Sequence, residues 1–310
     1  MKFNPTSLKR VASIDIGTNT ILLLIAEVGE ENINPLFEME TIVRLGEGVQ
    51  KNGTLMKEAM NRGLQTLSQY LERCQAMEVQ KIFAVGTSAL REAKNSEDFL
   101  KLVKAKLNLS IEVISGEEEA QLSFLAVAKD LREVKEPILV VDVGGGSTEF
   151  ILGRGRQIGQ CISLPLGSVR FTEQFLHSDP VREEEWQKME RKIRELLVNI
   201  PHSQEPLSMV AVGGTATTLS SVDQGLEEFI AEKIHHFVLI KEALKNQLLL
   251  YRSKTIDERR KIPGLPVARA DVILAGGAIL YLAMEELKCS SVLISCQGLR
   301  YGLLYKMLTL

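Results

Sequence analysis

The sequence lacks the cysteine patterns and the long apolar segments that would place the protein in a membrane or an oxidising compartment. Its four cysteines include no C-x-x-C pair and no zinc-like spacing, which argues against a disulfide framework and a cysteine zinc site. The longest uncharged apolar run, residues 272–284, has 13 residues and is too short to span a bilayer. The first ten residues contain no apolar core of the length that a secretory signal needs. We therefore expect a cytoplasmic protein with structural thiols.

The sequence also lacks a large excess of charge of either sign, and it has few aromatic residues. The chain has 37 basic and 40 acidic residues, a net charge of −3, and aromatic residues make up only 5% of it. A basic domain or stripe, which nucleic-acid binding would normally require, is missing, so neither nucleic acid nor a membrane is an expected partner. An anionic ligand would have to be bound by locally placed groups. With 310 residues, two domains of ordinary size are expected.

Two pairs of motifs recur at one spacing. The segments RVASIDIGTNTILLLIAEV and ILVVDVGGGSTEFILG each predict a strand, a polar loop and a second strand. The segments KIFAVGTSALREA and MVAVGGTATTLSS each predict a strand, a glycine turn and a helix. Asp15 and Asp142 differ by 142 − 15 = 127, and Gly86 and Gly213 by 213 − 86 = 127. This common offset and the alternation of strands and helices predict a duplicated α/β domain.

The two polar loops have the composition of anion-binding turns. Small residues leave backbone N–H groups accessible, and concave arrays of such donors bind phosphate. If the loops face each other across two domains, they would bind neighbouring phosphates of one substrate. The expected phosphate-binding residues are Gly17, Thr18 and Asn19 in the first loop and Gly144, Gly145, Gly146 and Ser147 in the second.

Carboxylates inside an anion site require a cation to bridge them. Asp142 and Glu149 flank the second loop, and Asp15 precedes the first. Mg²⁺ binds such oxygen ligands, directly or through water. We therefore expect these three residues to hold Mg²⁺ or another divalent cation.

The two glycine turns place helix N-termini near the same loops. Phosphate could bind at Gly214 and Thr215, and Arg91 could add a charge-assisted hydrogen bond. The alternative is ordinary N-capping of these helices by Thr87, Ser88 or Thr215. Both interpretations remain open from the sequence.

The segment ISGEEEAQL offers candidates for a catalytic base. Ser115 and Glu118 have the spacing of a capping box, which uses one glutamate. A carboxylate here could orient and deprotonate a water molecule for attack on phosphorus. The spacing does not choose between Glu117, Glu118 and Glu119.

The ordered motifs together resemble the exopolyphosphatase and guanosine pentaphosphate phosphohydrolase family (Ppx/GppA). The resemblance runs from about residue 11 to residue 306 and is carried by eight segments. They are IDIGTNT, GTSALREA, ISGEEEAQL, VVDVGGGSTE, PLGSVRF, VAVGGTATT, IPGLPVARADVILAGGAIL and GLRYGLLY.

The resemblance implies the fold of the actin, Hsp70 and sugar kinase superfamily. It consists of two ribonuclease-H-like α/β domains with mixed sheets flanked by helices and an interdomain cleft. We expect the first domain to comprise residues 1–117 and 298–310, and the second residues 118–297. The closing helix would then return to the first domain.

The resemblance also implies roles for individual residues. Glu119 matches the catalytic glutamate, and Asp142 and Glu149 match the acidic residues that serve metal and phosphate. Arg91 matches the arginine of the family's G-T-x-x-L-R motif, and residues 15–19 match its first loop. Arg44 and Arg269 would add positive charge near phosphate.

Two departures from the family pattern change the expectations. Tyr301 stands where the motif G-L-R-E-G has glutamate, so a polar role of that position is not expected to carry over. Longer members have a further helical domain resembling HD phosphohydrolases. A chain ending near residue 310 should therefore hold a shorter stretch of polyphosphate or hold it less processively.

These observations predict an Mg²⁺-dependent exopolyphosphatase that removes the terminal phosphate of inorganic polyphosphate, as a monomer or homodimer. One alternative is hydrolysis of the 5′-terminal phosphate of guanosine pentaphosphate. Others are a non-enzymatic sensor of guanosine tetraphosphate or pentaphosphate and a phosphotransferase of the same superfamily. The phosphate-binding motifs are common to these substrates and do not separate them.

Overall fold

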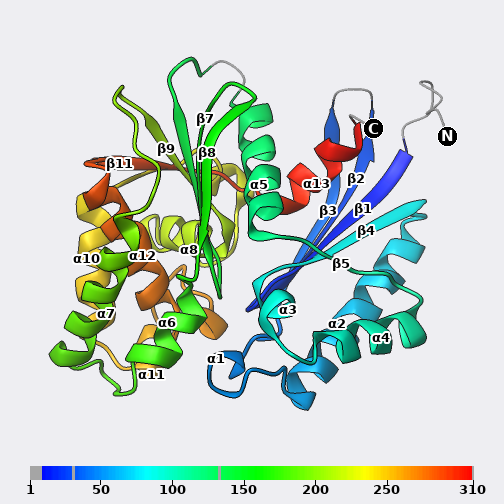
Figure 1. Cartoon of the computed structure of the whole chain (residues 1–310), viewed down its shortest axis with the longest axis horizontal. Helices are drawn as coiled ribbons and strands as arrows, with labels where there is room; N and C mark the ends of the chain where they lie inside the picture. Colours follow the sequence, from blue (N-terminus) through cyan, green and yellow to red (C-terminus); the bar gives the residue numbers. More distant parts are fainter. Residues whose placement is uncertain (1–8, 30–31, 132–133, 309–310) are drawn as a thin grey trace. The chain divides into compact units, whose positions relative to one another are not determined.

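The computed structural model describes residues 9–29, 32–131 and 134–308 (Figure 1). Its contacts divide the chain into two compact units. Unit 1 comprises Met1–Ala126 and Leu299–Leu310, and unit 2 comprises Val127–Gly298. The division falls inside helix α5 (Gly116–Asp130), between Ala126 and Val127, whereas the boundary expected from the sequence lies after residue 117.

Unit 1 is a five-stranded mixed sheet with strand order β3-β2-β1-β4-β5. Strands β1, β2 and β3 form an antiparallel meander, whereas β4 and β5 run parallel to β1. The strands are β1 (Lys9–Ile16), β2 (Thr20–Val28), β3 (Ile33–Ile42), β4 (Lys81–Gly86) and β5 (Glu112–Val113). The helices besides α5 are α1 (Val49–Asn52), α2 (Lys57–Ala76), α3 (Ser88–Glu92), α4 (Ser96–Leu107) and α13 (Leu299–Leu308).

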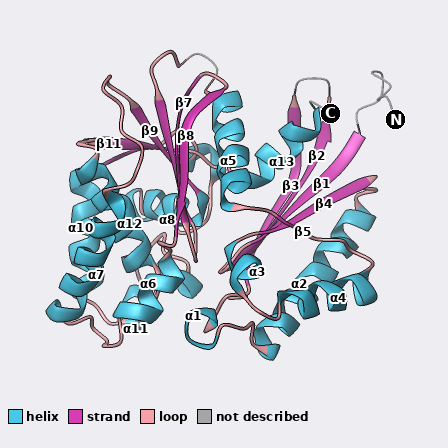
Figure 2. Ribbon diagram, in the orientation of Figure 1, coloured by secondary structure: helices cyan, strands magenta, loops and turns pink. Residues whose placement is uncertain are grey.

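Alternate side chains of β1 supply the cores on the two faces of this sheet, as the period of a strand requires. Ile14 packs in the core that includes Leu67 of α2. Val11 packs in a second core with Leu304 of α13. Figure 2 shows α2 and α4 on one side of the sheet and α13 on the other. Helix α13, near the end of the chain, therefore packs on the sheet of unit 1.

Helix α13 contacts α5 at very short range. A Cβ atom on Gly302 would lie 1.9 Å from the carbonyl oxygen of Leu122, so only glycine fits there. Tyr301 is 5% exposed, and its hydroxyl is hydrogen-bonded to Glu38 of β3. The tyrosine that replaces the family's glutamate is thus a packed residue of unit 1.

Unit 2 is a six-stranded mixed sheet with strand order β10-β11-β9-β6-β7-β8. Its strands are β6 (Ile138–Val143), β7 (Thr148–Arg154), β8 (Gln157–Leu164), β9 (Ser208–Val212), β10 (Val238–Ile240) and β11 (Ser291–Ile294). Its helices are α6 (Ser168–Phe175), α7 (Glu183–Leu197), α8 (Gly213–Asp223), α9 (Ala231–Ile234), α10 (Lys241–Arg252), α11 (Ile256–Arg259) and α12 (Ile273–Glu286), with a 3₁₀ turn at Val267–Arg269. Strand β6 pairs antiparallel with β7 and parallel with β9, as β1 does with β2 and β4.

The two sheets have the same strand order at their centres. The order β3-β2-β1-β4 in unit 1 corresponds to β8-β7-β6-β9 in unit 2, followed by β5 and β11 respectively. This is the ribonuclease-H-like arrangement, and it confirms the predicted α/β fold class and the duplication predicted from the offset of 127 residues. Strand β5 is short and pairs at Glu112–Val113 with the end of β4.

The apolar run at residues 272–284 forms most of α12. This helix is buried on nearly every side and packs against α6, α7, α8 and α10. A helix that is apolar all round belongs in a protein core. In the described part of the chain, none of the helices combines the length and apolarity that a membrane span requires.

Candidate functional site

The two polar loops form the same turn. In unit 1 the N–H of Gly17 donates to the carbonyl of Thr20 at 2.9 Å, and in unit 2 the N–H of Gly144 donates to the carbonyl of Ser147 at 3.0 Å. A Cβ atom on either glycine would lie 3.0 Å from that carbonyl oxygen. Both bonds link equivalent positions of the duplicated domains, since 144 − 17 and 147 − 20 are each 127. The sequence pattern therefore identified two copies of one backbone structure.

The carbonyl groups of the unit 1 loop are bound from one side. The carbonyl of Thr18 accepts from the N–H of Gly46 at 2.8 Å. The carbonyl of Asn19 accepts from the N–H groups of Val43 and Arg44 at 2.9 and 2.8 Å. Because a trans peptide directs its C=O and N–H groups in opposite directions, the N–H that follows each carbonyl points away from residues 43–46. The main chain places Arg44, a predicted phosphate-binding residue, beside the first loop.

The side chains of Thr18 and Asn19 carry buried polar atoms without a partner. Thr18 is 8% exposed and Asn19 is 5% exposed. The hydroxyl of Thr18 and both amide atoms of Asn19 make no hydrogen bond within the part of the chain that the structure describes. An unsatisfied buried polar group costs about 1–3 kcal/mol, so such groups call for an explanation. Hydroxyl and amide donors at a loop of this kind suit the oxygens of a phosphate.

The structure distinguishes the three consecutive glutamates at the start of α5. The N–H of Ser115 donates to Glu118 Oε2 at 3.0 Å, and the N–H of Glu118 donates to Ser115 Oγ at 3.1 Å, which confirms the predicted capping box. Hydrogen bonds from the N–H and then the hydroxyl of Ser115 to the Glu118 carboxylate lower the pKa of Glu118. Glu117 is exposed. Glu119 is 9% exposed and accepts a hydrogen bond from Arg91 Nη1 at 2.7 Å.

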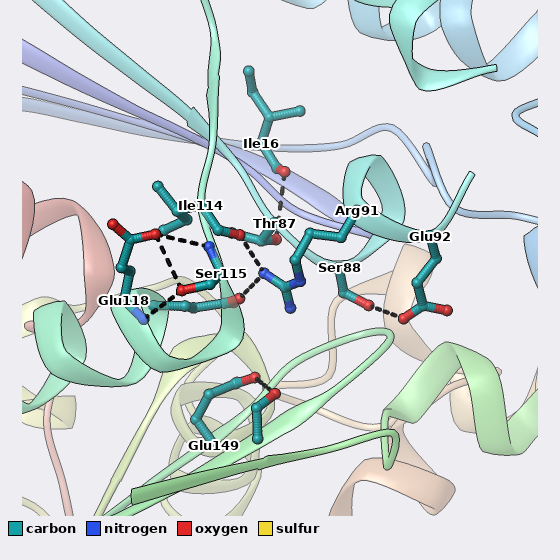
Figure 3. Close-up of polar contacts among 11 residues, drawn as sticks. Ile16, Thr87, Ser88, Arg91, Glu92, Ile114, Ser115, Glu118 and Glu149 are labelled. Atoms are coloured by element: carbon teal, nitrogen blue, oxygen red, sulfur yellow. Dashed lines mark hydrogen bonds and ion pairs between the residues drawn. The ribbon is translucent and has the colours of Figure 1, made fainter. Parts of the chain in front are cut away.

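Arg91 joins α3 to the segment before α5. Its Nη1 donates both to the carboxylate of Glu119 and, at 3.0 Å, to the carbonyl of Ile114. Figure 3 shows the guanidinium beside Ile114 and Ser115. A carboxylate held by a guanidinium in this way has few orientations open to it. Of the predicted site residues that lie in unit 1, the structure therefore brings Arg91 and Glu119 into direct contact.

The predicted capping roles of the threonines and serine after the glycine turns are wrong. Thr87 occupies the N-cap position of α3 without a side-chain cap, and its N–H donates to the carbonyl of Ile16 at 3.2 Å. Ser88 Oγ donates to Glu92 instead. Thr215 Oγ1 donates at 3.1 Å to the carbonyl of Val143, the position equivalent to Ile16. Both threonine residues thus bind the end of a neighbouring parallel strand, and Thr215 is part of the support of the second loop.

The unit 2 loop rests on the start of α6. The carbonyls of Gly144 and Gly145 accept hydrogen bonds, each of 2.9 Å, from the N–H groups of Ser168 and Val169. A Cβ atom on Gly167 would lie 2.3 Å from the carbonyl oxygen of Gly145, so the contact requires glycine at that position. With these carbonyls bound to α6, the following N–H groups point to the opposite side, as in unit 1.

The acidic residues of the second loop form a cross-strand pair. Asp142 and Glu149 are directly opposite in the register of β6 and β7. Glu149 is 1% exposed and accepts a hydrogen bond from Ser163 Oγ at 2.7 Å (Figure 3). Like charges in such positions are unfavourable unless other groups compensate them. Two carboxylates and a hydroxyl are an all-oxygen donor set, which suits Mg²⁺.

The third predicted metal residue lies in the other unit. Asp15 is the equivalent of Asp142, but its cross-strand partner is Leu22, at the position equivalent to Glu149. The carboxylate pair is therefore a property of unit 2 alone. The participation of Asp15 in metal binding stays a prediction.

Arg269 covers the first turn of α8. A Cβ atom on Gly214 would lie 2.0 Å from Nη2 of Arg269, and the arginine is only 6% exposed. A Cβ atom on the preceding Gly213 would lie 2.7 Å from Oδ1 of Asp142. The structure therefore gathers Asp142, Gly214, Thr215 and Arg269 at the N-terminus of one helix, where the helix dipole also favours an anion.

A further polar cluster in unit 2 was not predicted. Among the residues that the structure describes, Asp130, His235 and His236 form the only group of three histidine, cysteine, aspartate or glutamate side chains close enough to share a metal ion. The N–H of Cys296 donates to Nδ1 of His235 at 3.2 Å, which places the ring proton on Nε2, 3.3 Å from Asp130. This proton occupies the position that a metal would need. The cluster is therefore a hydrogen-bonded group. Asp130 lies 106 residues from His236, so spacing in the sequence could not indicate that it joins the two adjacent histidines.

Comparison with known proteins agrees with this geometry. Residues 24–310 match the model of the Ppx/GppA phosphatase family. The chain is 36% identical over 294 residues to exopolyphosphatase 2 of Mycobacterium tuberculosis, with 91% of this chain and 90% of that protein covered. It is 38% identical over 296 residues to the bifunctional 3-dehydroquinate synthase/phosphatase of Fusobacterium nucleatum, covering 92% of this chain but only 44% of that protein.

Two crystal structures are similar over nearly the whole chain. The Aquifex aeolicus member of the Ppx/GppA family gives a TM-score of 0.83 at 34% identity, with 98% of each chain covered. An exopolyphosphatase from Cytophaga hutchinsonii gives a TM-score of 0.89 at 29% identity, with 97% of this chain and 98% of that chain covered. The chain therefore belongs to the Ppx/GppA phosphatase family.

Proposed function

We propose that the protein is an exopolyphosphatase that hydrolyses the terminal phosphoanhydride bond of inorganic polyphosphate with the help of Mg²⁺. The observation that carries the proposal is the pair of equivalent loops. In each loop, main-chain N–H groups of a neighbouring segment bind the loop carbonyls, so that the N–H groups of the loop point to the opposite side. The unpartnered buried donors of Thr18 and Asn19 support it, because a phosphate would satisfy them. The similarity to a named exopolyphosphatase over 90% of its length points to the same substrate class.

In the proposed reaction a water molecule attacks the terminal phosphorus atom while the bond to the bridging oxygen breaks. Glu119 would orient the water and accept its proton, and the shortened polyphosphate would leave with the bridging oxygen. Arg91 would keep the Glu119 carboxylate in one orientation through the 2.7 Å bond. The N–H groups of the loops and Arg269 would bind phosphate oxygens as their charge is redistributed.

Asp142 and Glu149 are the residues that would hold Mg²⁺. Their opposed positions on β6 and β7 and the hydroxyl of Ser163 support this assignment. When bound, the ion would supply positive charge that offsets the negative charge of the phosphates.

Guanosine pentaphosphate is the second candidate substrate. The family includes guanosine pentaphosphate phosphohydrolases, and the contacts proposed for the loops are to phosphate groups rather than to a base. The same residues could therefore act on the terminal phosphate of either molecule.

The test is a side-by-side measurement of phosphate release from long polyphosphate, inorganic tripolyphosphate and guanosine pentaphosphate, in Mg²⁺ and in EDTA. We expect the largest kcat/KM with long polyphosphate and Mg²⁺, and little release in EDTA. Release from guanosine pentaphosphate alone would assign the second substrate. Binding without release would favour a sensor, and phosphate appearing on an added acceptor would indicate a phosphotransferase.

A further inference from the structure

The third glycine of the unit 2 loop is held differently from the first two. Main-chain N–H groups of α6 bind the carbonyls of Gly144 and Gly145. The carbonyl of Gly146 instead accepts a 2.6 Å hydrogen bond from Nε of Arg170, in the first turn of the same helix. In the described part of the chain, Arg170 supplies the only hydrogen bond to that carbonyl. The orientation of the peptide between Gly146 and Ser147 therefore depends on one side chain.

We propose that Arg170 is a positioning residue for phosphate binding, which acts by holding this peptide. With the carbonyl of Gly146 turned toward Arg170, planarity of the trans peptide turns the N–H of Ser147 to the opposite side. That side is the one to which the other loop N–H groups point. The inference rests on the proposed function, because it assigns those N–H groups to phosphate oxygens.

The backbone around the loop leaves little room for another arrangement. The first turn of α6 approaches so closely that a Cβ atom on Gly167 would lie 2.5 Å from the carbonyl carbon of Gly146. The hydrogen bond from a charged donor is of the stronger kind. Because glycine peptides rotate easily, loss of this bond would free the peptide of Gly146 to reorient.

The equivalent loop of unit 1 needs no such side chain. Its carbonyls at Thr18 and Asn19 are bound by main-chain N–H groups of residues 43, 44 and 46. A side-chain substitution cannot remove those bonds. Arg170 is therefore a specific feature of the second loop, whose three consecutive glycines make it the more deformable of the two.

Two substitutions separate the hydrogen bond from the charge. In glutamine the amide nitrogen lies as many bonds from Cα as Nε does in arginine. Glutamine therefore keeps an N–H donor at this position but carries no charge. Methionine has the same length and no donor. We expect Arg170→Met to raise KM for polyphosphate about tenfold, with a smaller change in kcat, and Arg170→Gln to stay within about threefold of the wild type. Arg154→Ala, which removes an exposed arginine paired with Glu205, is the control.

The Kd of inorganic tripolyphosphate, measured by calorimetry in EDTA, should rank the variants as KM does, with weak binding by Arg170→Met and nearly wild-type binding by Arg170→Gln. Equal weakening by glutamine and methionine would overturn the proposal, because the charge alone would then explain the effect. An unchanged Kd in Arg170→Met would also overturn it. If the methionine variant does not fold, Arg170→Lys replaces it, since lysine keeps the charge but carries its donor one atom further out. Lysine with wild-type affinity would contradict the role of Nε.

The calorimetric series also separates this inference from the proposed function. If the wild type releases no phosphate from any of the three substrates, the proposed hydrolysis fails. The ranking of tripolyphosphate affinities would still decide whether Arg170 orients the loop.

Discussion

Glu119 and Arg91, 28 residues apart in the sequence, form an ion pair in which Oε2 lies 2.7 Å from Nη1. The side chains are 12% and 21% exposed, so little solvent competes for the contact. The pair distinguishes Glu119 from the two glutamates before it. Its geometry leads to a first prediction about catalysis.

Glu119→Gln should keep the fold and the affinity for polyphosphate but lose turnover by about 10²–10⁴-fold, because the amide keeps the size of the side chain and loses its basicity. Steady-state kinetics and thermal unfolding measure both effects. Glu117→Gln is the matched control on the same helix turn and should be active. A Glu119→Gln variant with near-normal kcat would remove Glu119 from the proposed role.

Glu118→Ala should show the opposite behaviour. Glu118 completes the capping box with Ser115 and alanine cannot, so this substitution is expected to reduce the free energy of unfolding by about 1 kcal/mol while leaving kcat nearly unchanged. Urea denaturation and phosphate release on the same preparation test this. A strong loss of kcat without a loss of stability would show that the assignment between neighbouring glutamates is incorrect.

Gly214→Ala should weaken phosphate binding without unfolding unit 2. The added methyl group would overlap Nη2 of Arg269, and this end of a flexible side chain can move aside. Because alanine also favours a helix, we expect a stability change within about 1 kcal/mol. KM for polyphosphate should rise by about tenfold, since a charge-assisted bond would be displaced.

Gly159→Ala is the control for that experiment. Its Cβ atom would make only an ordinary contact, 3.5 Å from the carbonyl oxygen of Leu152. Its KM should match that of the wild type. Equal KM values for both alanine variants would argue against a role of Arg269 in binding.

Asp142→Asn should abolish stabilisation by Mg²⁺. An ion bound to the folded state at 100 times its Kd stabilises it by about 2.7 kcal/mol, which differential scanning calorimetry in Mg²⁺ and EDTA would detect. The variant should show the same melting temperature in both conditions. Asp257→Asn, at an exposed carboxylate paired with Arg260, should retain the wild-type difference. Persistence of the full difference in Asp142→Asn would place the ion elsewhere.

Asp130 should make folding stability depend on pH in the acid range. Burial alone would raise the pKa of Asp130, but hydrogen bonds from His235 and His236 lower it below its ordinary value of 3.8. A carboxyl with a lowered pKa stabilises the folded state above its unfolded pKa, and this contribution is lost as the pH falls through the folded pKa.

The variant Asp130→Asn isolates this contribution. Above about pH 5 it should be less stable than the wild type by about 1–3 kcal/mol, and the difference should diminish as the pH is lowered below 4. Urea denaturation of both proteins across this range measures the effect. If the difference in the free energy of unfolding between the two proteins grew as the pH fell, the hydrogen bonds from His235 and His236 to Asp130 would not be its cause.

The sequence alone determined the duplicated architecture and the position of both loops. The offset of 127 residues linked Asp15 to Asp142 and Gly86 to Gly213. In the structure Asp15 pairs with Val85 and Asp142 with Val212, and the two glycines are the residues that follow. Such patterns can be read from a sequence because strand periodicity and turn geometry are local. The capping box of Ser115 and Glu118 was predictable for the same reason.

Tertiary structure alone decided which partner each polar group takes. It pairs Glu119 with Arg91, turns Thr87 and Thr215 to strand carbonyls instead of helix caps, and joins Asp130 to His236 across 106 residues. It also assigns Arg170 to the carbonyl of Gly146. Hydrogen bonds are short and directional, so their partners depend on the distance between elements brought together by the apolar core, which sequence spacing does not contain.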